Sequence, residues 1–64
     1  MTLKVYDYTN GDGKIILEDY EYNKSDALML CNVDLITVDG QDYEIFETKA
    51  NGYVTKLELA VRKH

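Results

Sequence analysis

The sequence predicts a small all-β domain, an antiparallel meander of about five strands. Glycine turns occur at Asn10–Gly13, Asp39-Gly40 and Asn51-Gly52, between segments rich in Val, Ile, Leu, Tyr and Thr. The chain has no proline and no low-complexity tract that would separate two folding units. We therefore expect one domain, residues 1–64, whose strands are joined mostly by hairpins.

The alternation of apolar and polar residues predicts which side chains share a face. If each turn is a three-residue loop (11–13, 38–40 and 50–52), the odd-numbered apolar residues gather on one side of the sheet. These are Leu3, Val5, Ile15, Leu17, Val33, Leu35, Tyr43, Ile45, Leu57, Leu59 and Val61. The same register places Asp34 opposite Glu44 and Glu44 opposite Glu58, like-charge pairs that cost up to ~1 kcal/mol each. Burying aliphatic side chains at ~1.5–3 kcal/mol each outweighs that cost.

The opposite face is expected to be rich in tyrosine. It would carry Tyr6, Tyr8, Ile16, Tyr20, Tyr22, Ile36, Val38 and Phe46. A flat sheet would leave too much of this surface wet, so we expect curling, cover by segment 23–32, or pairing with another chain. Strand number and length favour a small barrel that resembles the SH3-like or OB-like type.

Segment 23–32, NKSDALMLCN, allows two interpretations. The favoured one is a short apolar strand over residues 27–31. The alternative is a short helix near 26–31, capped by Ser25, which would make the domain α+β.

The first turn resembles a calcium-binding loop of the EF-hand and dockerin type. Counted from Tyr8, Asn10, Asp12 and Asp19 occupy ligand positions 3, 5 and 12. A neutral phenol at position 1 is a poor ligand, however, and Ile15-Ile16-Leu17 is typical of a strand rather than of a helix. We therefore predict a hairpin turn without a metal, and keep these three residues as weak metal candidates.

Composition argues against an enzyme and gives no sign of a cofactor. His64 is the last residue and Cys31 lies among apolar residues, so neither is suited to acid–base or nucleophilic chemistry. A single cysteine, together with no leader-like or membrane-spanning segment, predicts a cytoplasmic protein.

The expected function is that of a non-enzymatic, acidic protein-interaction module. Its net charge is −5, and positions 25–48 hold six acidic and no basic residues, so nucleic acid is an unlikely partner. The candidate binding residues are Tyr6, Tyr8, Tyr20, Tyr22, Asp42 and Glu44, because tyrosine favours interfaces. Two alternatives stay open: an acidic inhibitor from a mobile element that imitates nucleic acid, and a domain that binds a small ligand, either a sugar or calcium. A homodimer is also open, with the segment 53–62 as an exposed edge.

Overall fold

The computed structural model describes residues 1–53 and 55–64, except for the side chains of Asp19, Tyr20, Ala27, Leu28 and Cys31. The strands are β1 (Thr2–Asp7), β2 (Lys14–Glu21), β3 (Leu35–Val38), β4 (Gln41–Ala50) and β5 (Lys56–Lys63). A helix, α1 (Lys24–Met29), and a single 3₁₀ turn, η1 (Leu30–Asn32), connect β2 to β3.

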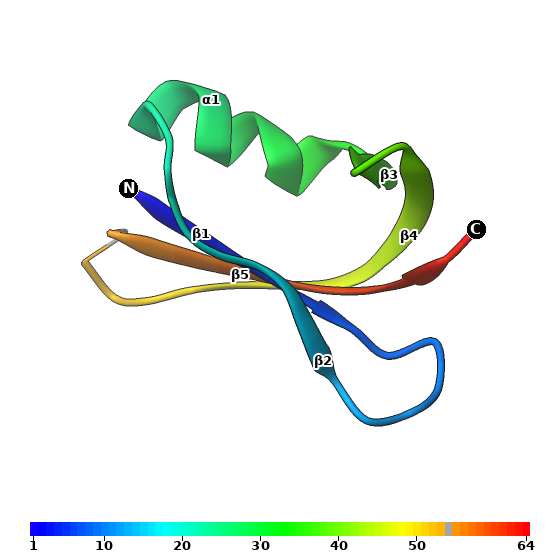
Figure 1. Cartoon of the computed structure of the whole chain (residues 1–64). Coiled ribbons are helices and arrows are strands. Elements are labelled where there is room, and N and C mark those ends of the chain that lie inside the picture. The colour runs from blue at the N-terminus through cyan, green and yellow to red at the C-terminus, as the bar shows by residue number, and fades with distance from the viewer. Residues whose placement is uncertain (54) are drawn as a thin grey trace.

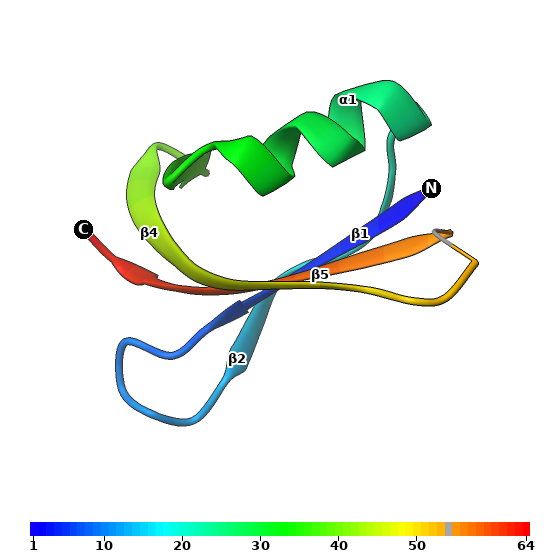
Figure 2. The same ribbon diagram turned by 180° about the vertical axis from the view of Figure 1, so that it is seen from behind.

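The five strands form one curled sheet in the order β2-β1-β5-β4-β3. Three neighbouring pairs are antiparallel, while β1 and β5 run parallel at its centre. The sheet curls into a half-barrel, with β4 bending up towards the helical segment, which lies across one side (Figures 1 and 2). The predicted class, a small and mostly antiparallel sheet of about five strands that curls, is therefore confirmed.

The core lies between the sheet and the helical segment. Its buried residues come mainly from the two central strands: Leu3, Val5, Tyr43, Leu57, Leu59 and Val61. All six belong to the predicted odd-numbered set, and Leu17 and Ile45 pack against them. Because β5 pairs with strands on both sides, segment 53–62 cannot serve as an exposed edge, and that prediction is wrong.

The predicted three-residue loops are wrong. The β3–β4 turn holds two residues, Asp39 and Gly40, both with positive φ, and pairs Val38 with Gln41. This is the chemistry of a type I′ hairpin, whose twist matches that of the strands. Such a loop reverses the parity of β3, so Ile36 and Val38 pack on the core whereas Val33 and Leu35 are each 44% exposed.

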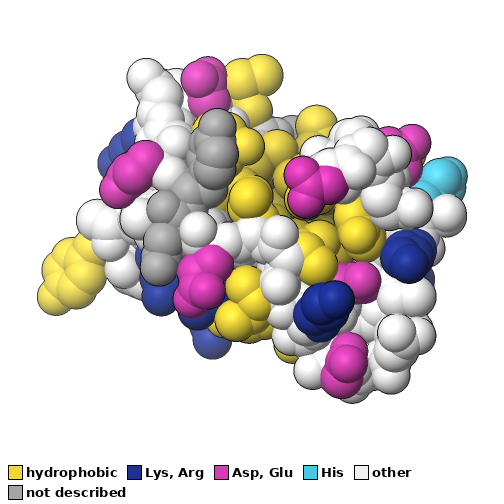
Figure 3. All heavy atoms as spheres, viewed as in Figure 1, with side chains coloured by type: hydrophobic (Ala, Val, Ile, Leu, Met, Phe, Trp, Pro, Cys, Tyr) yellow, Lys and Arg dark blue, Asp and Glu magenta, His cyan; other side chains and the backbone are white. Residues whose placement is uncertain are grey.

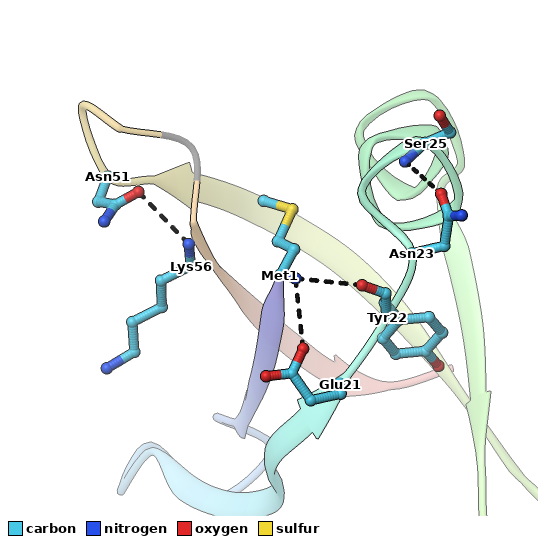
Figure 4. A network of polar contacts seen from close by, with 7 residues as sticks. All are labelled: Met1, Glu21, Tyr22, Asn23, Ser25, Asn51 and Lys56. Atoms are coloured by element: carbon cyan, nitrogen blue, oxygen red, sulfur yellow. Dashed lines mark hydrogen bonds and ion pairs between the residues drawn. The ribbon is translucent and has the colours of Figure 1, made fainter.

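The other two turns are longer than predicted. The β4–β5 loop runs from Asn51 to Thr55, and the Asn51 side chain accepts a hydrogen bond from the backbone N–H of Thr55. It accepts a second one from the backbone N–H of Lys56 (Figure 4). The β1–β2 connection spans residues 8–13, and the pairing of these two strands shifts register twice. Ile16 and Leu17 consequently both contact the core, while Ile15 is exposed.

The observed register also removes the predicted like-charge pairs. Glu44 lies opposite Arg62, and Glu58 lies opposite Lys49. The longer β4–β5 loop moves the partner of Glu44 from Glu58 to Arg62, and the two-residue β3–β4 turn pairs Glu44 with Leu35 instead of Asp34. A bulge at Phe46, where the pairing skips one residue of β4, then shifts the register by one and brings Lys49 opposite Glu58. Opposite charges across the strands stabilise the pairing of β4 with β5, whereas the predicted register would have placed like charges opposite each other.

The connecting segment is helical, so the short helix is confirmed and the strand over residues 27–31 is wrong. The helix begins at Lys24, two residues before the predicted start, because Asn23 rather than Ser25 caps it. The Asn23 side chain accepts a hydrogen bond from the Ser25 N–H at 2.8 Å, as Figure 4 shows. The same figure shows the Met1 amino group donating to Glu21 Oε2 and to the Tyr22 carbonyl, which fixes the start of β1 against the end of β2.

Candidate functional site

The candidate site lies on the face of the sheet that is turned away from α1. Side chains alternate along a strand, so the residues between the buried positions of β1 and β5 point to this second face. Lys4, Tyr6, Glu58 and Ala60 are placed there because Leu3, Val5, Leu57 and Leu59 occupy the core. The parallel register brings Tyr6 opposite Ala60 and Lys4 opposite Glu58.

A shallow groove of about 350 Å³ opens on this face. It is lined by Tyr6 and Tyr8 from the β1 side, Glu47 and Lys49 from β4, and Glu58, Leu59 and Ala60 from β5. Three segments distant in the sequence thus build one hollow, which is lined by two tyrosine rings and the small side chain of Ala60. Its volume is at the lower end of the range for ligand pockets and is suited to a single side chain.

Tyr6 is fixed in this groove by charged neighbours. Its hydroxyl donates to Glu58 Oε2 at 2.9 Å, and the Lys4 Nζ lies 5.6 Å from the centre of its ring. Lys4 in turn pairs with Glu18 Oε1 at 3.4 Å. The hydrogen bond to Glu58 raises the pKa of Tyr6, and the hydrogen bond to Tyr6 raises the pKa of Lys4. Both groups therefore stay protonated at neutral pH.

Tyr8 begins a chain of contacts along the rim of the groove. Its ring meets Phe46 edge to face, with ring centres 5.7 Å apart. The Arg62 guanidinium lies 5.5 Å from the Phe46 ring centre, and its Nη2 donates to Glu44 Oε1 at 2.8 Å. The same guanidinium lowers the pKa of Glu44. Tyr8 and Phe46 are still 42% and 46% exposed, so their rings are available to a ligand.

The loop that follows β1 holds Tyr8 in place. The ring lies directly against Gly13, where an added Cβ would be only 2.9 Å from Tyr8 Cε1. Asp7 accepts hydrogen bonds from the backbone N–H and the hydroxyl of Thr9, and these lower the pKa of its carboxyl group. The Thr9 hydroxyl oxygen accepts a third hydrogen bond from the Lys63 N–H, which joins the loop to the end of β5.

The structure brings together only part of the predicted binding set. Tyr6 and Tyr8 line the groove, and Glu44 reaches its rim through Arg62 and Phe46. Tyr22 packs against the core instead, because the bulged pairing of β1 and β2 changes its face. Asp42 accepts a hydrogen bond from the Thr37 hydroxyl at 2.6 Å, at the β3–β4 hairpin and outside the groove lining. The side chain of the sixth candidate, Tyr20, lies outside the described residues.

Sequence reasoning missed the residues that β4 and β5 contribute. Glu47 and Lys49 reach this face because Phe46 forms a bulge in β4, and Glu58 comes next to Tyr6 because β1 pairs with β5. The cross-strand pairing of Glu44 with Arg62 and of Lys49 with Glu58 was the available signal. No single register of β4 and β5 joins both pairs, because the bulge at Phe46 lies between them.

The calcium-loop resemblance ends in a strand. Lys14–Glu21 is β2, so the predicted hairpin is confirmed, and Asn10 and Asp12 are exposed within its loop. The side chain of Asp19 lies outside the described residues. Among the side chains that are described, three or more His, Cys, Asp or Glu do not gather as they would around a metal ion. The absence of a metal stays a prediction.

Comparisons with protein-family models, with curated proteins and with solved structures gave no match for this chain. Neither helical segment in the described part of the chain has the length and apolarity needed to cross a membrane. The site is therefore interpreted from its own geometry.

Proposed function

We propose that this chain is a non-enzymatic module that binds another protein through the groove, by receiving an arginine or lysine side chain. The observation that carries the proposal is the pairing of aromatic walls with carboxylates in one hollow. Tyr6 and Tyr8 supply the rings, and Glu47 and Glu58 supply the negative charge. A guanidinium group fits this hollow best, since its flat face stacks on aromatic rings while its N–H groups donate to carboxylates around its edge.

The charge of Glu47 supports this proposal. Among the described residues, Glu47 makes no hydrogen bond or ion pair with another side chain, although it is exposed at the groove. Glu58 accepts one hydrogen bond, from Tyr6, and a carboxylate has lone pairs for about three more. Lys49 contributes one positive charge, so the three charged lining residues sum to −1.

The titration of the site favours binding over catalysis. Tyr6 and Lys4 have raised pKa values, whereas Asp7 and Glu44 have lowered ones. Each of these shifts moves the pKa of the group further from pH 7. A general acid or base, in contrast, works best with a pKa near the operating pH. The groups around the groove are therefore suited to fixed hydrogen bonds and fixed charges.

The test is an NMR titration with N-acetyl-arginine-methylamide, compared with its neutral isostere made from citrulline. We expect the arginine compound to shift the backbone amide signals of Tyr6, Tyr8, Glu47 and Ala60, and to leave those of α1 unchanged. The citrulline compound should bind at least threefold more weakly. Equal shifts from both compounds, or shifts confined to residues outside the groove, would contradict the proposal.

Three charge variants make the titration specific. Glu47→Gln should weaken arginine binding about twofold to fivefold, the range of one exposed ion pair, and Lys49→Gln should strengthen it. Asp26→Asn removes the same charge as Glu47→Gln from α1, on the other side of the sheet, and should change the affinity little. Glu47→Gln and Asp26→Asn change the net charge equally, so a loss of affinity in Glu47→Gln alone would distinguish a binding groove from general attraction to an acidic protein.

A further inference from the structure

The outer strand β3 has an open edge. It pairs with β4 on one side only and ends the strand order of the sheet. The Ile45 N–H donates to the Asp34 carbonyl at 2.8 Å, and hydrogen-bonded positions alternate along an antiparallel pair. Ile36 and Val38 therefore also direct their backbone groups towards β4. Leu35 and Thr37 direct theirs away from it, to the open edge.

This edge lacks the charged residues and the register shifts found on the other outer strand. Strand β2 carries Lys14, Glu18 and Glu21, and its pairing with β1 shifts register twice. Charges and bulges of this kind keep an edge strand from pairing with another chain. Strand β3 reads Leu-Ile-Thr-Val, has no charged residue and pairs in unbroken register.

The surroundings of β3 are apolar and acidic. Leu35 within the strand and Val33 two residues before it are each 44% exposed. Asp34 precedes the strand and Asp39 follows it, within the stretch 25–48 that has six acidic and no basic residues. Figure 3 shows hydrophobic side chains gathered below the helical segment, with Asp and Glu side chains around them.

We propose that β3 accepts an extended segment of a partner protein as a sixth strand, and that this segment alternates basic and apolar residues. Its backbone would pair with the N–H and C=O groups of Leu35 and Thr37, as in other cases of strand addition. Its apolar side chains would cover Val33 and Leu35, and its basic side chains would meet Asp34 and Asp39. A second copy of this chain fits less well, because pairing β3 with β3 would bring two acidic stretches together.

The test uses the hexapeptide acetyl-KVKVKV-amide and its acidic counterpart acetyl-EVEVEV-amide, with amide hydrogen exchange of the chain as the readout. We expect the basic peptide to slow exchange at Leu35 and Thr37 at least tenfold, while the amides of the groove residues Tyr6 and Tyr8 keep their rates. The acidic peptide should have no effect. Unchanged exchange at Leu35 and Thr37, or equal protection by both peptides, would overturn the proposal.

Three protein variants separate edge pairing from surface attraction. Thr37→Pro removes an outward N–H without removing a bond to β4, and should lower peptide affinity at least tenfold. Thr37→Val is its matched control, because it also loses the hydrogen bond to Asp42 but keeps the N–H, and it should bind as the natural chain does. If Thr37→Pro does not fold, the double variant Asp34→Asn, Asp39→Asn tests the proposed contact with basic side chains. It should bind the peptide more weakly than the natural chain, and its affinity should depend less on salt. Sedimentation of the free chain as a dimer that Thr37→Pro abolishes would assign the edge to a second copy and overturn the proposal.

Discussion

At the scale of single residues, the position of Tyr8 depends on the absence of a side chain at Gly13. Gly13 has φ +66 and lies under the Tyr8 ring, which then meets Phe46. Gly13 thus has two roles: it adopts the left-handed backbone conformation, and it leaves space for the Tyr8 ring.

Gly13→Ala should destabilise the fold and also weaken arginine binding. A left-handed backbone costs an alanine about 1–2 kcal/mol, and the contact with Tyr8 should add to that cost. Gly11→Ala is the matched control, since Gly11 has φ +82 but no atom within 4 Å of an added Cβ. Urea unfolding of the two variants, followed by the arginine titration, measures both effects. Equal loss of stability and unchanged arginine binding in both variants would show that Tyr8 is not held by Gly13.

At the scale of elements, the Asp39-Gly40 turn determines which side of β3 is buried. Two residues with positive φ fit a type I′ turn, and this loop length sends Ile36 and Val38 into the core. Asparagine is favoured at the first position of such a turn, whereas a β-branched residue is strongly disfavoured there.

Asp39→Asn should therefore have the stability of the natural chain, within about 0.5 kcal/mol, or exceed it. Asp39→Val should lower the free energy of unfolding by about 1–2 kcal/mol, because valine would be held at the φ of +50 that Asp39 adopts. Urea denaturation measures both. Equal midpoints for the two variants would contradict the type I′ assignment.

The same turn explains how much of the fold the sequence could predict. Strand positions, the curled all-β class and the core residues of β1 and β5 follow from local alternation, which is why Leu3, Val5, Leu57 and Leu59 were identified. Loop lengths do not follow from it, because a glycine turn is compatible with two, three or five residues. One wrong loop length reverses a whole strand, as the exposure of Leu35 shows.

The candidate site was predictable to the same degree. Tyr6 and Tyr8 lie in regular positions of β1 or just after it, so their shared face could be predicted. The β4 and β5 lining could not, because it requires the Phe46 bulge and a parallel pair between strands at opposite ends of the chain. Non-local pairing of this kind leaves no periodic signal within either strand.

At the scale of the whole molecule, the two faces of the sheet have different roles. One face packs on the helical segment and holds the buried residues, and the other carries the groove (Figures 1 and 2). A domain of 64 residues has little stability to spare. Separating the faces lets the groove keep exposed rings and unpaired charges without opening the core.

The most direct test of a protein-binding groove is photo-crosslinking with p-benzoylphenylalanine placed at position 49 or at position 53, in an extract of the cells that produce the protein. Lys49 lines the groove, whereas Tyr53 is 87% exposed and lies outside the groove lining. We predict a defined protein adduct from position 49 that excess N-acetyl-arginine-methylamide suppresses, and no such adduct from position 53. An adduct from position 53 alone, or one from position 49 that the arginine compound leaves unchanged, would contradict the proposed function.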